Sequence, residues 1–296
     1  MKKLFRNSAL VCVFAIFLKP ALNRASAAET GNNDALTSAM QRELQRAQSE
    51  LGKLDPAPYF ISYSAYDQTS ATVVGSQGSL INSIHARKRS ADVIVRIGTP
   101  ALDNTHDENR SSALSSGSLP LDDDSDAIAH VLWQLTYGEY RKASQAYLNV
   151  KTKTQVQAQE EDTSPDFSRE TPQSHADYKD LSPAPDQQVF EKLARRYSSY
   201  LRKYPYIYSS NVVVTAQRTQ FHFVSTEGSH VVTTSALVRL AIEAETRADD
   251  GMELMRVETF QAESPSHLPG EAEITARMEK MASDLKALRA APVAEP

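Results

Sequence analysis

The chain has 296 residues, of which 41% are hydrophobic and 23% are charged, and its formal net charge is −5. This composition is typical of a globular protein that is large enough for one or two domains. The acidic balance provides no basic surface of the kind that binds nucleic acid, so we expect no nucleic-acid partner.

Residues 1–28 have the layout of a secretory signal peptide. The positive stretch MKKLFRN precedes the apolar run SALVCVFAIFL, and the small residues Ala25-Ser26-Ala27 follow at a site of the A-x-A kind. The run is shorter than the roughly 20 residues that span a bilayer, so we expect cleavage after Ala27 or Ala28. The product would be periplasmic or secreted, with no membrane attachment. Cys12 is the only cysteine and leaves with this segment, so the mature chain would hold no disulfide and no cysteine zinc ligand.

Residues 29–150 form the first predicted half of the chain. Apolar residues at helical spacing over 36–51 predict a helix with Asn33 or Asp34 as its N-cap. Alternating apolar residues over 59–63 and 93–97, with the glycine turn GSQGS at 75–79, predict an antiparallel meander of three or four strands. After a long polar loop, an apolar stripe from Ile128 to Tyr147 predicts a second, long helix.

Residues 151–185 contain few large apolar groups and are interpreted as a polar linker or surface excursion. Residues 186–296 form the second predicted half and end in a linker-like tail. A helix with an apolar stripe at four-residue spacing comes first, followed by strands joined by turns at Glu227–Gly228 and Asp249–Gly251. A final helix completes this half. The two stripes consist of Val189, Leu193, Tyr197 and Leu201, and of Ile274, Met278, Met281, Leu285 and Leu288.

The predicted fold class is α+β, with antiparallel β-meanders packed against long helices in two similar helix–sheet–helix halves. The two halves show no repeat at the level of individual residues.

The most conspicuous polar motif is SLPLDDDSDAIAHVLW at 118–133, in which Asp122, Asp123, Asp124 and Asp126 precede a histidine. This motif is either a metal or acid–base site or the start of a helix. Carboxylates at a helix N-terminus accept hydrogen bonds from free backbone N–H groups and complement the helix dipole. Adjacent aspartates also fan out around the helix axis instead of converging on one ion. We therefore interpret the run as a helix start.

The histidines offer no recognisable zinc motif, because none of them is followed by glutamate. His106, with Asp107 and Glu108, could bind a metal weakly, but a solvated polar loop is the favoured interpretation because a site needs at least three converging ligands. His222 and His230 flank a turn. A two-residue loop would pair Ser225 with His230 and separate the two histidines, whereas a three-residue loop would place them on one face. The seven histidines are His85, His106, His130, His175, His222, His230 and His267.

Three further motifs have plainer interpretations. GSQGS at 75–79 lacks the lysine and the following helix of a phosphate loop, so it predicts a hairpin turn. The basic cluster HARKRS at 85–90 is interpreted as a solvated strand end. The aromatic patch YPYIY at 204–208 could line a peptide groove, although a packed entry to a strand is favoured. We therefore predict no catalytic, cofactor-binding or metal-binding residue in this chain.

The order of several longer segments carries a family resemblance. DPAPYFISYSAYD, VGSQGSLINSIHARKRSADVIVRIGTPALDNT and LPLDDDSDAIAHVLWQLTYGEYRKASQAYLN follow one another, and SPDFSRETP comes next in the polar stretch. Together they resemble the N-terminal domain of TldD/PmbA-type proteins, once called modulators of DNA gyrase, and more closely a secreted branch of that group. The resemblance covers about residues 34–290, and its motifs are diffuse.

The resemblance implies zinc metallopeptidases of α+β fold that act on unfolded or extended peptides, often as homo- or heterodimers with a family member. In that group the zinc motif is HExxxH on a helix of a C-terminal domain, and it is absent from this sequence. We therefore expect no cofactor in this chain, with zinc only in a missing C-terminal domain. ALRAAPVAEP resembles the segment that leads into that domain, so we expect the chain to be truncated before it.

Two functions follow from these expectations. The first is the N-terminal part of a metallopeptidase, which forms the substrate channel, contributes to dimerisation and is inactive alone. The second is a stand-alone, non-catalytic periplasmic protein that binds peptides or a partner, since the resembled family includes partners without zinc. The linker-like ending APVAEP favours the first. Exposure of the apolar stripe on the final helix would also indicate a missing domain.

Overall fold

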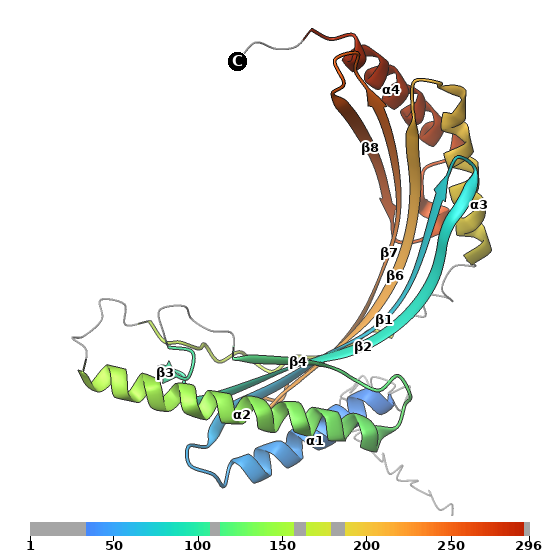
Figure 1. Cartoon of the computed structure of the whole chain (residues 1–296). Coiled ribbons are helices and arrows are strands. Elements are labelled where there is room, and N and C mark those ends of the chain that lie inside the picture. The colour runs from blue at the N-terminus through green and yellow to red at the C-terminus, as the bar shows by residue number, and fades with distance from the viewer. Residues whose placement is uncertain (1–33, 107–112, 157–163, 179–186, 293–296) are drawn as a thin grey trace, which may run out of the picture. The chain divides into compact units, whose positions relative to one another are not determined.

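The computed structural model describes residues 34–106, 113–156, 164–178 and 187–292, and the predicted signal peptide lies outside them. None of the helices in these ranges is both long enough and apolar enough to cross a membrane. The elements, labelled in Figure 1 where there is room, are α1 (Ala35–Leu51), β1 (Pro58–Ser76), β2 (Ser79–Thr99), β3 (Leu102–Asp103), β4 (Leu114–Ser118), α2 (Ser125–Val156), β5 (Ser174–Ala176), α3 (Gln187–Tyr200), a 3-10 turn (Leu201–Lys203), β6 (Ser209–Ser225), β7 (His230–Arg247), β8 (Glu253–Ala262), a second 3-10 turn (Pro265–His267) and α4 (Glu271–Arg289).

Four long antiparallel strands form the centre of one eight-stranded sheet. β1 and β2 form one hairpin and β6 and β7 form another, with β3, β4, β5 and β8 at the margins. The two hairpins are joined because β1 pairs with β6 from Ser62↔Ser225 to Gly75↔Val212. The α+β class is confirmed, and strands from both predicted halves belong to a single sheet.

One face of this sheet carries two hydrophobic cores, one near each end of the long strands. Alternate residues of a strand share a face, so Tyr63, Ala65, Ala71 and Val73 of β1 all point to the same side. Tyr63 and Ala65 pack in a core with α1 and α2. Ala71 and Val73 pack in a second core with α3 and α4. We call this side the helical face and the opposite side the open face.

The amphipathic patterns of the helices are largely confirmed. Asp34 is the N-cap of α1 and its carboxylate accepts a hydrogen bond from the Leu36 amide at 3.1 Å. The predicted stripe on α3 begins one residue too early, because Val189 is 42% exposed and Phe190 is buried in its place. On α4, Met278, Met281 and Leu285 are buried in the second core. Most of that stripe is therefore covered by the chain's own sheet. The stripe thus does not provide the exposed apolar surface that would indicate a missing domain.

Part of the predicted polar excursion is attached to the sheet. α2 continues to Val156, and β5 runs parallel to the edge of β7 with Ser174 opposite His230. The Phe167 ring packs against Phe60 with ring centroids 4.8 Å apart, and the Arg96 guanidinium lies 4.7 Å from the centre of the same ring. The segment over 164–178 therefore covers one end of the open face.

Gly98 near the end of β2 should be sensitive to substitution. Its φ is +113°, and a Cβ there would lie 2.5 Å from Tyr147 Cε2 and 2.6 Å from the Leu102 carbonyl oxygen. We expect Gly98→Ala to lower the free energy of unfolding by about 2–3 kcal/mol, through backbone strain plus overpacking. Urea denaturation measures this loss.

Gly251 provides the matched control, because its φ is +93° and a Cβ added there would have no other atom within 4 Å. Gly251→Ala should cost only the backbone strain, about 1 kcal/mol. Equal losses in the two variants would contradict the steric role of Gly98.

Candidate functional site

The helical face becomes polar between its two cores. On β1 the residues between Ala65 and Ala71 that point to this face are Asp67 and Thr69, which are only partly buried. Their cross-strand neighbours on β2 and β6 are charged or polar as well. Asp67 lies opposite Arg89 and Gln220, and Thr69 lies opposite Arg87 and Arg218.

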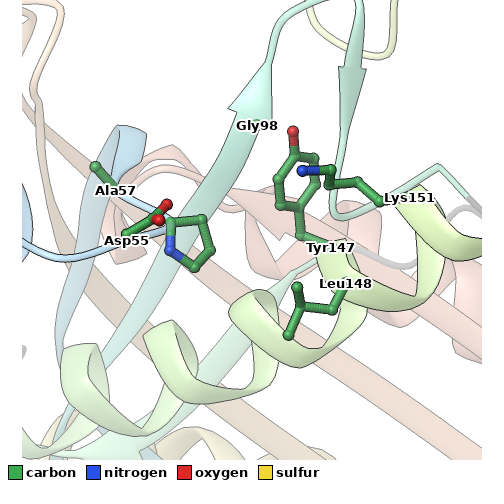
Figure 2. A pocket seen from close by; sticks show the side chains of 7 residues that line it. Asp55, Ala57, Gly98, Tyr147, Leu148 and Lys151 are labelled. Carbon is green, nitrogen blue, oxygen red and sulfur yellow. The ribbon is translucent and has the colours of Figure 1, made fainter.

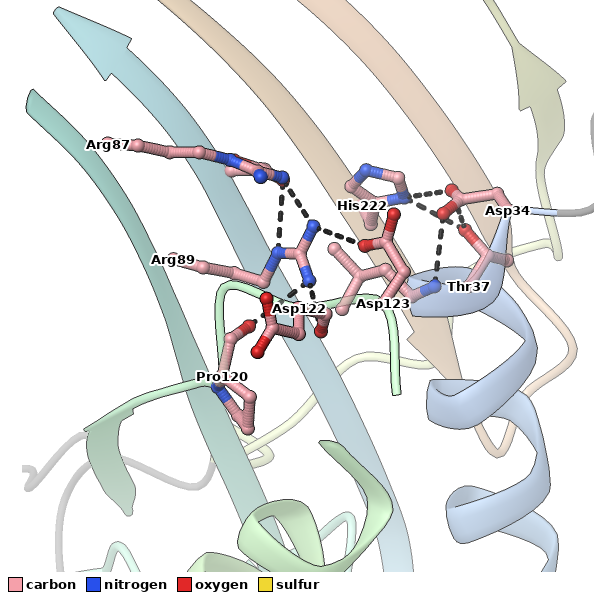
Figure 3. A network of polar contacts seen from close by, with 10 residues as sticks. Asp34, Thr37, Arg87, Arg89, Pro120, Asp122, Asp123 and His222 are labelled. Atoms are coloured by element: carbon pink, nitrogen blue, oxygen red, sulfur yellow. Dashed lines mark hydrogen bonds and ion pairs between the residues drawn. The ribbon is translucent and has the colours of Figure 1, made fainter. Parts of the chain in front are cut away.

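Arg89 is the most buried member of this polar region, with only 4% of its surface exposed. Its guanidinium donates to Asp67 at 2.6 Å. It also donates to Asp123 at 2.8 Å and to the Pro120 carbonyl at 3.1 Å (Figure 3). The prediction that the cluster HARKRS is a solvated strand end is therefore wrong for Arg89. The fork of donors on a guanidinium suits this role, because it can hold two carboxylates and a backbone carbonyl at once.

Asp67 receives hydrogen bonds from two arginines. Arg87 donates to it through Nε at 3.1 Å and through a terminal nitrogen at 2.7 Å, in addition to the bonds from Arg89. Burial by itself would raise the pKa of the Asp67 carboxyl, but hydrogen bonds and charges from Arg87 and Arg89 outweigh it and lower that pKa. Asp67 is therefore held as a carboxylate and is poorly suited to act as an acid or a base near neutral pH.

The aspartate run starts α2, as predicted, and its members diverge. Asp124 accepts hydrogen bonds from the backbone N–H groups of Asp126 and Ala127 at 2.9 and 3.1 Å. Asp126 pairs with Arg42 of α1 at 2.7 Å, whereas Asp123 turns to Arg89. The run therefore caps one helix and connects it to a second helix and to the sheet.

His222 joins β6 to the N-terminus of α1. Its side chain is 1% exposed, and Nδ1 lies 2.9 Å from Asp34 Oδ2 and 2.8 Å from Thr37 Oγ1 (Figure 3). Because a carboxylate only accepts hydrogen bonds, the contact with Asp34 places a proton on Nδ1. Nε2 is buried and has no hydrogen-bond partner among the residues that the structure describes.

The turn between β6 and β7 follows the alternative that places the two histidines on one face. His230 pairs with Val224, not with Ser225, so the connection is longer than two residues. His222 pairs with Val232, and this register places His222 and His230 on the same face. His230 Nε2 is also buried, with no hydrogen-bond partner in the described part of the chain. Within the described residues, however, no group of three or more histidine, cysteine, aspartate or glutamate side chains is placed to hold a metal.

His106 is anchored to the rest of the chain. Asp107 and Glu108, its proposed companions, lie outside the described residues. His106 Nδ1 lies 2.7 Å from Asp166 Oδ1, and the Asp166 side chain is fully buried. The second oxygen of Asp166 accepts a hydrogen bond from the Asp103 amide at 2.9 Å. The interpretation of His106 as part of a solvated loop is therefore wrong, because it fixes the segment after α2 to the end of β2.

A hollow of about 400 Å³ lies beside the C-terminal part of α2 (Figure 2). It contains one ammonium group, on Lys151, and one carboxylate, on Asp55, and no hydrogen bond or ion pair joins the two. Tyr147 forms part of the wall, with the Lys151 nitrogen 5.8 Å from the centre of its ring. These groups supply neither a nucleophile–base pair nor a ligand set. The lining residues are Asp55, Pro56, Ala57, Gly98, Tyr147, Leu148 and Lys151.

Two other predicted motifs behave as expected. Ser76 pairs with Ser79 across a turn in which Gln77 and Gly78 have positive φ, so GSQGS is a hairpin turn. In YPYIY, Tyr204 and Tyr206 pack against the second core, and Tyr206 donates a hydrogen bond to the Ala282 carbonyl at 2.9 Å. Of its three tyrosines only Tyr208 is strongly exposed, at 50%, so this patch is a packed entry to β6.

The open face differs chemically from the helical face along β1 and β6. Its residues from Ser64 to Val74 and from Asn211 to Phe223 are partly or fully exposed, and none of them carries a charge. Tyr66 and Phe221 are neighbours across the strands, with ring centroids 5.2 Å apart. The surface can therefore offer hydroxyls, amides and aromatic rings to a ligand. Its members are Ser64, Tyr66, Gln68, Ser70, Thr72, Val74, Asn211, Val213, Thr215, Gln217, Thr219, Phe221 and Phe223.

The chain matches no protein-family model and no curated protein, but it is similar to solved structures. A candidate modulator of DNA gyrase from Bacteroides thetaiotaomicron aligns with a TM-score of 0.51 and 11% identity, over 81% of this chain and 49% of that one. A candidate modulator of a DNA gyrase from Thermotoga maritima has a TM-score of 0.44 and 15% identity, over 82% and 47%. TldE from Thermococcus kodakarensis has a TM-score of 0.46 and 10% identity, over 84% and 47%.

The Bacteroides structure confirms the resemblance to TldD/PmbA-type proteins at the level of the fold. The described chain has the fold of about half of that protein. The chain also spans about half the length of the other two structures.

The contact between Asp34 and His222 should make stability depend on acid pH. Burial alone would raise the pKa of Asp34, but hydrogen bonds from His222, Thr37 and the Leu36 amide lower it from 3.8 to about 2. A lowered pKa stabilises the fold above pH 3.8, and this contribution is lost as the pH falls through about 2. We expect Asp34→Asn, which keeps the helix cap, to lower the free energy of unfolding by about 1 kcal/mol near neutral pH, after allowance for solvent screening.

Urea denaturation between about pH 2 and pH 6 measures the difference between Asp34→Asn and the wild type, which should shrink toward zero at the acid end. Asp249→Asn is the control, because the Asp249 side chain is 96% exposed. A difference for Asp34→Asn that does not change with pH would contradict the proposed role of its charge.

Proposed function

We propose that this chain is the substrate-side part of an exported, TldD/PmbA-like zinc metallopeptidase, and that its open face receives unfolded or extended peptides. The observation that supports this most directly is the uncharged, accessible surface of β1 and β6, opposite the helices. The fold shared with the Bacteroides protein supports the relation to this group. Catalysis, dimerisation with a family member and a periplasmic or secreted location are parts of the same proposal.

The central part of the open face, on β1 and β6, suits peptides of varied sequence, and charged residues such as Lys88 of β2 and Arg239 of β7 flank it. A charged surface would select ligands of opposite charge, whereas hydroxyl and amide side chains form hydrogen bonds with any backbone. The Tyr66–Phe221 pair adds apolar contact area, which tolerates many side chains. This arrangement favours broad recognition of extended chains over selection of one sequence.

The sheet edges offer a second mode of contact for an extended peptide. Among the described residues, β8 pairs only with β7, so one of its sides presents unpaired backbone groups there. Met255 and Val257, which are 58% and 48% exposed, lie along this strand. Strand addition at such an edge uses main-chain hydrogen bonds and is therefore largely independent of sequence.

The proposal assigns zinc chemistry to residues outside this chain. The sequence has no HExxxH, and the described residues contain no metal-binding group of three ligands. We expect purified residues 28–296 to bind no stoichiometric zinc and to cleave no peptide, as measured by metal analysis after dialysis and by a fluorogenic peptide assay. One equivalent of zinc that is lost on His222→Ala or His230→Ala would overturn this expectation.

Peptide binding to the open face can be measured by fluorescence anisotropy with a fluorescein-labelled peptide that is too short to fold. We expect the double variant Tyr66→Ser/Phe221→Ser to bind at least fivefold more weakly than the wild type, because it removes both rings of the open-face pair. The reduced affinity should hold for several unrelated peptide sequences.

Trp133→Ser/Tyr137→Ser is the matched control. These two rings also stack, with centroids 6.3 Å apart, but they lie exposed on α2. Wild-type affinity in this control, together with loss in the open-face variant, supports the proposal. An equal loss in both variants, or no peptide binding by the wild type, would contradict it.

A second candidate function is a stand-alone, non-catalytic binder of peptides or of a protein partner. It is favoured by α4, whose residues Met278, Met281 and Leu285 are buried in the chain's own core. The intact mass of the native protein from its source cells distinguishes the two. A longer product that contains HExxxH supports the peptidase, and a product that ends at Pro296 supports the binder.

A further inference from the structure

The polar middle of the helical face contains a hollow of about 380 Å³. Its centre is Thr69 of β1, which lies directly opposite Arg87 of β2 and Arg218 of β6. The three residues thus form one row across three strands, with the two arginines about 10 Å apart at their backbones, or two strand spacings. The lining residues are Asp67, Thr69, Arg87, Arg218 and Gln220.

Some hydrogen-bond donors in this hollow are already in use. Asp67 accepts from Nε and one terminal nitrogen of Arg87, and it also accepts from Arg89. The other terminal nitrogen of Arg87 makes no hydrogen bond within the described residues, so it is available to a ligand. The carboxylate of Asp67, the only acidic group in the lining, is occupied by these bonds.

Other donors have no protein partner. Within the described residues, the Arg218 guanidinium makes no hydrogen bond or ion pair, and the same holds for the side chains of Thr69 and Gln220. Arg218 is nevertheless only partly exposed. A guanidinium, a hydroxyl and an amide therefore remain free to bind a ligand that accepts hydrogen bonds.

Arg218 brings a positive charge without an ion pair among the described residues to this hollow, although the whole chain carries −5. Arg87, Arg89 and Arg218 bring three positive charges to this region. Asp67 and Asp123 balance two of them, and Asp123 is 68% exposed. The charge of Asp122 also acts on Arg87, so three carboxylates match the three arginines in number, but none of them forms an ion pair with Arg218 among the described residues.

We propose that this hollow binds a small molecule through an oxyanion, a phosphoryl or carboxylate group, which Arg218 and Arg87 hold across Thr69. Guanidinium groups make paired, charge-assisted hydrogen bonds with both kinds of oxyanion. The volume falls in the lower part of the range for small-molecule sites, so the ligand is larger than a bare ion. This site lies on the face opposite the proposed peptide surface and does not depend on that proposal.

Calorimetric titration with inorganic phosphate tests the site, at an ionic strength kept constant with sodium chloride. We expect saturable binding by the wild type and at least tenfold weaker binding by Arg218→Gln. Arg239→Gln is the matched control, because Arg239 is an exposed arginine on the open face of β7 and the variant has the same change in charge. It should bind phosphate like the wild type.

Arg218→Lys provides a second test, which retains the charge and the fold. It should bind several-fold more weakly, because an ammonium cannot make the two parallel hydrogen bonds of a guanidinium. Wild-type affinity in both Arg218 variants would overturn the proposal.

A parallel titration uses an N-acetylated dipeptide with a free C-terminal carboxylate, and its C-terminal amide. Binding of phosphate alone identifies a phosphoryl ligand, and binding of the acid but not of the amide identifies a carboxylate. Absence of saturable binding for both phosphate and the acid would overturn the proposal.

Discussion

The pairing of β1 with β6 is the constraint on which the rest of the structure depends. It joins two local hairpins into one sheet, along an uninterrupted register from Ser62 to Gly75. Because β1 is long, its two ends meet different helices, and a single strand contributes to both cores. The same pairing brings Arg218 of β6 into one row with Thr69 of β1 and Arg87 of β2, so this row exists only once the hairpins have joined.

The ion pairs of the buried Arg89, in the charged middle of the helical face, have a specific structural consequence. A buried charge is costly unless it is paired, and an apolar residue in place of Arg89 could be at least as stable. Arg89 nevertheless connects β2 to Asp67 on β1 and to Pro120 and Asp123 before α2. Arg89 therefore fixes the position of the N-terminus of α2 relative to the sheet. Apolar packing alone would define that position less precisely.

Local features of this fold could be predicted from the sequence. Asp34 and Asp124 cap helices because their side chains reach backbone groups two or three residues away. The turn at Gln77–Gly78 likewise follows from residue types that tolerate positive φ. Contacts between distant residues could not be predicted in this way. The His222 side chain forms a hydrogen bond with Thr37, 185 positions away in the sequence. No local pattern around either residue indicates this contact.

The basic cluster at 85–90 is a second case in which the sequence does not reveal a contact between distant residues. Alternation along β2 indicates that Arg87 and Arg89 share a face, but not that Asp67 lies opposite Arg89. The hairpin register supplies that partner, which explains why Arg89 is buried while its sequence neighbour Lys88 is exposed.

The two faces of the sheet thus carry different chemistry along the same strands. On β1 the helical face places Asp67 and Thr69 among arginines, whereas the open face places Tyr66 and Gln68 beside uncharged residues of β6. Because neighbouring residues of a strand point to opposite sides, the two surfaces are separated by the thickness of one sheet and share a backbone. A ligand on one face therefore leaves the side chains of the other face accessible, so oxyanion binding and peptide binding are compatible on one molecule.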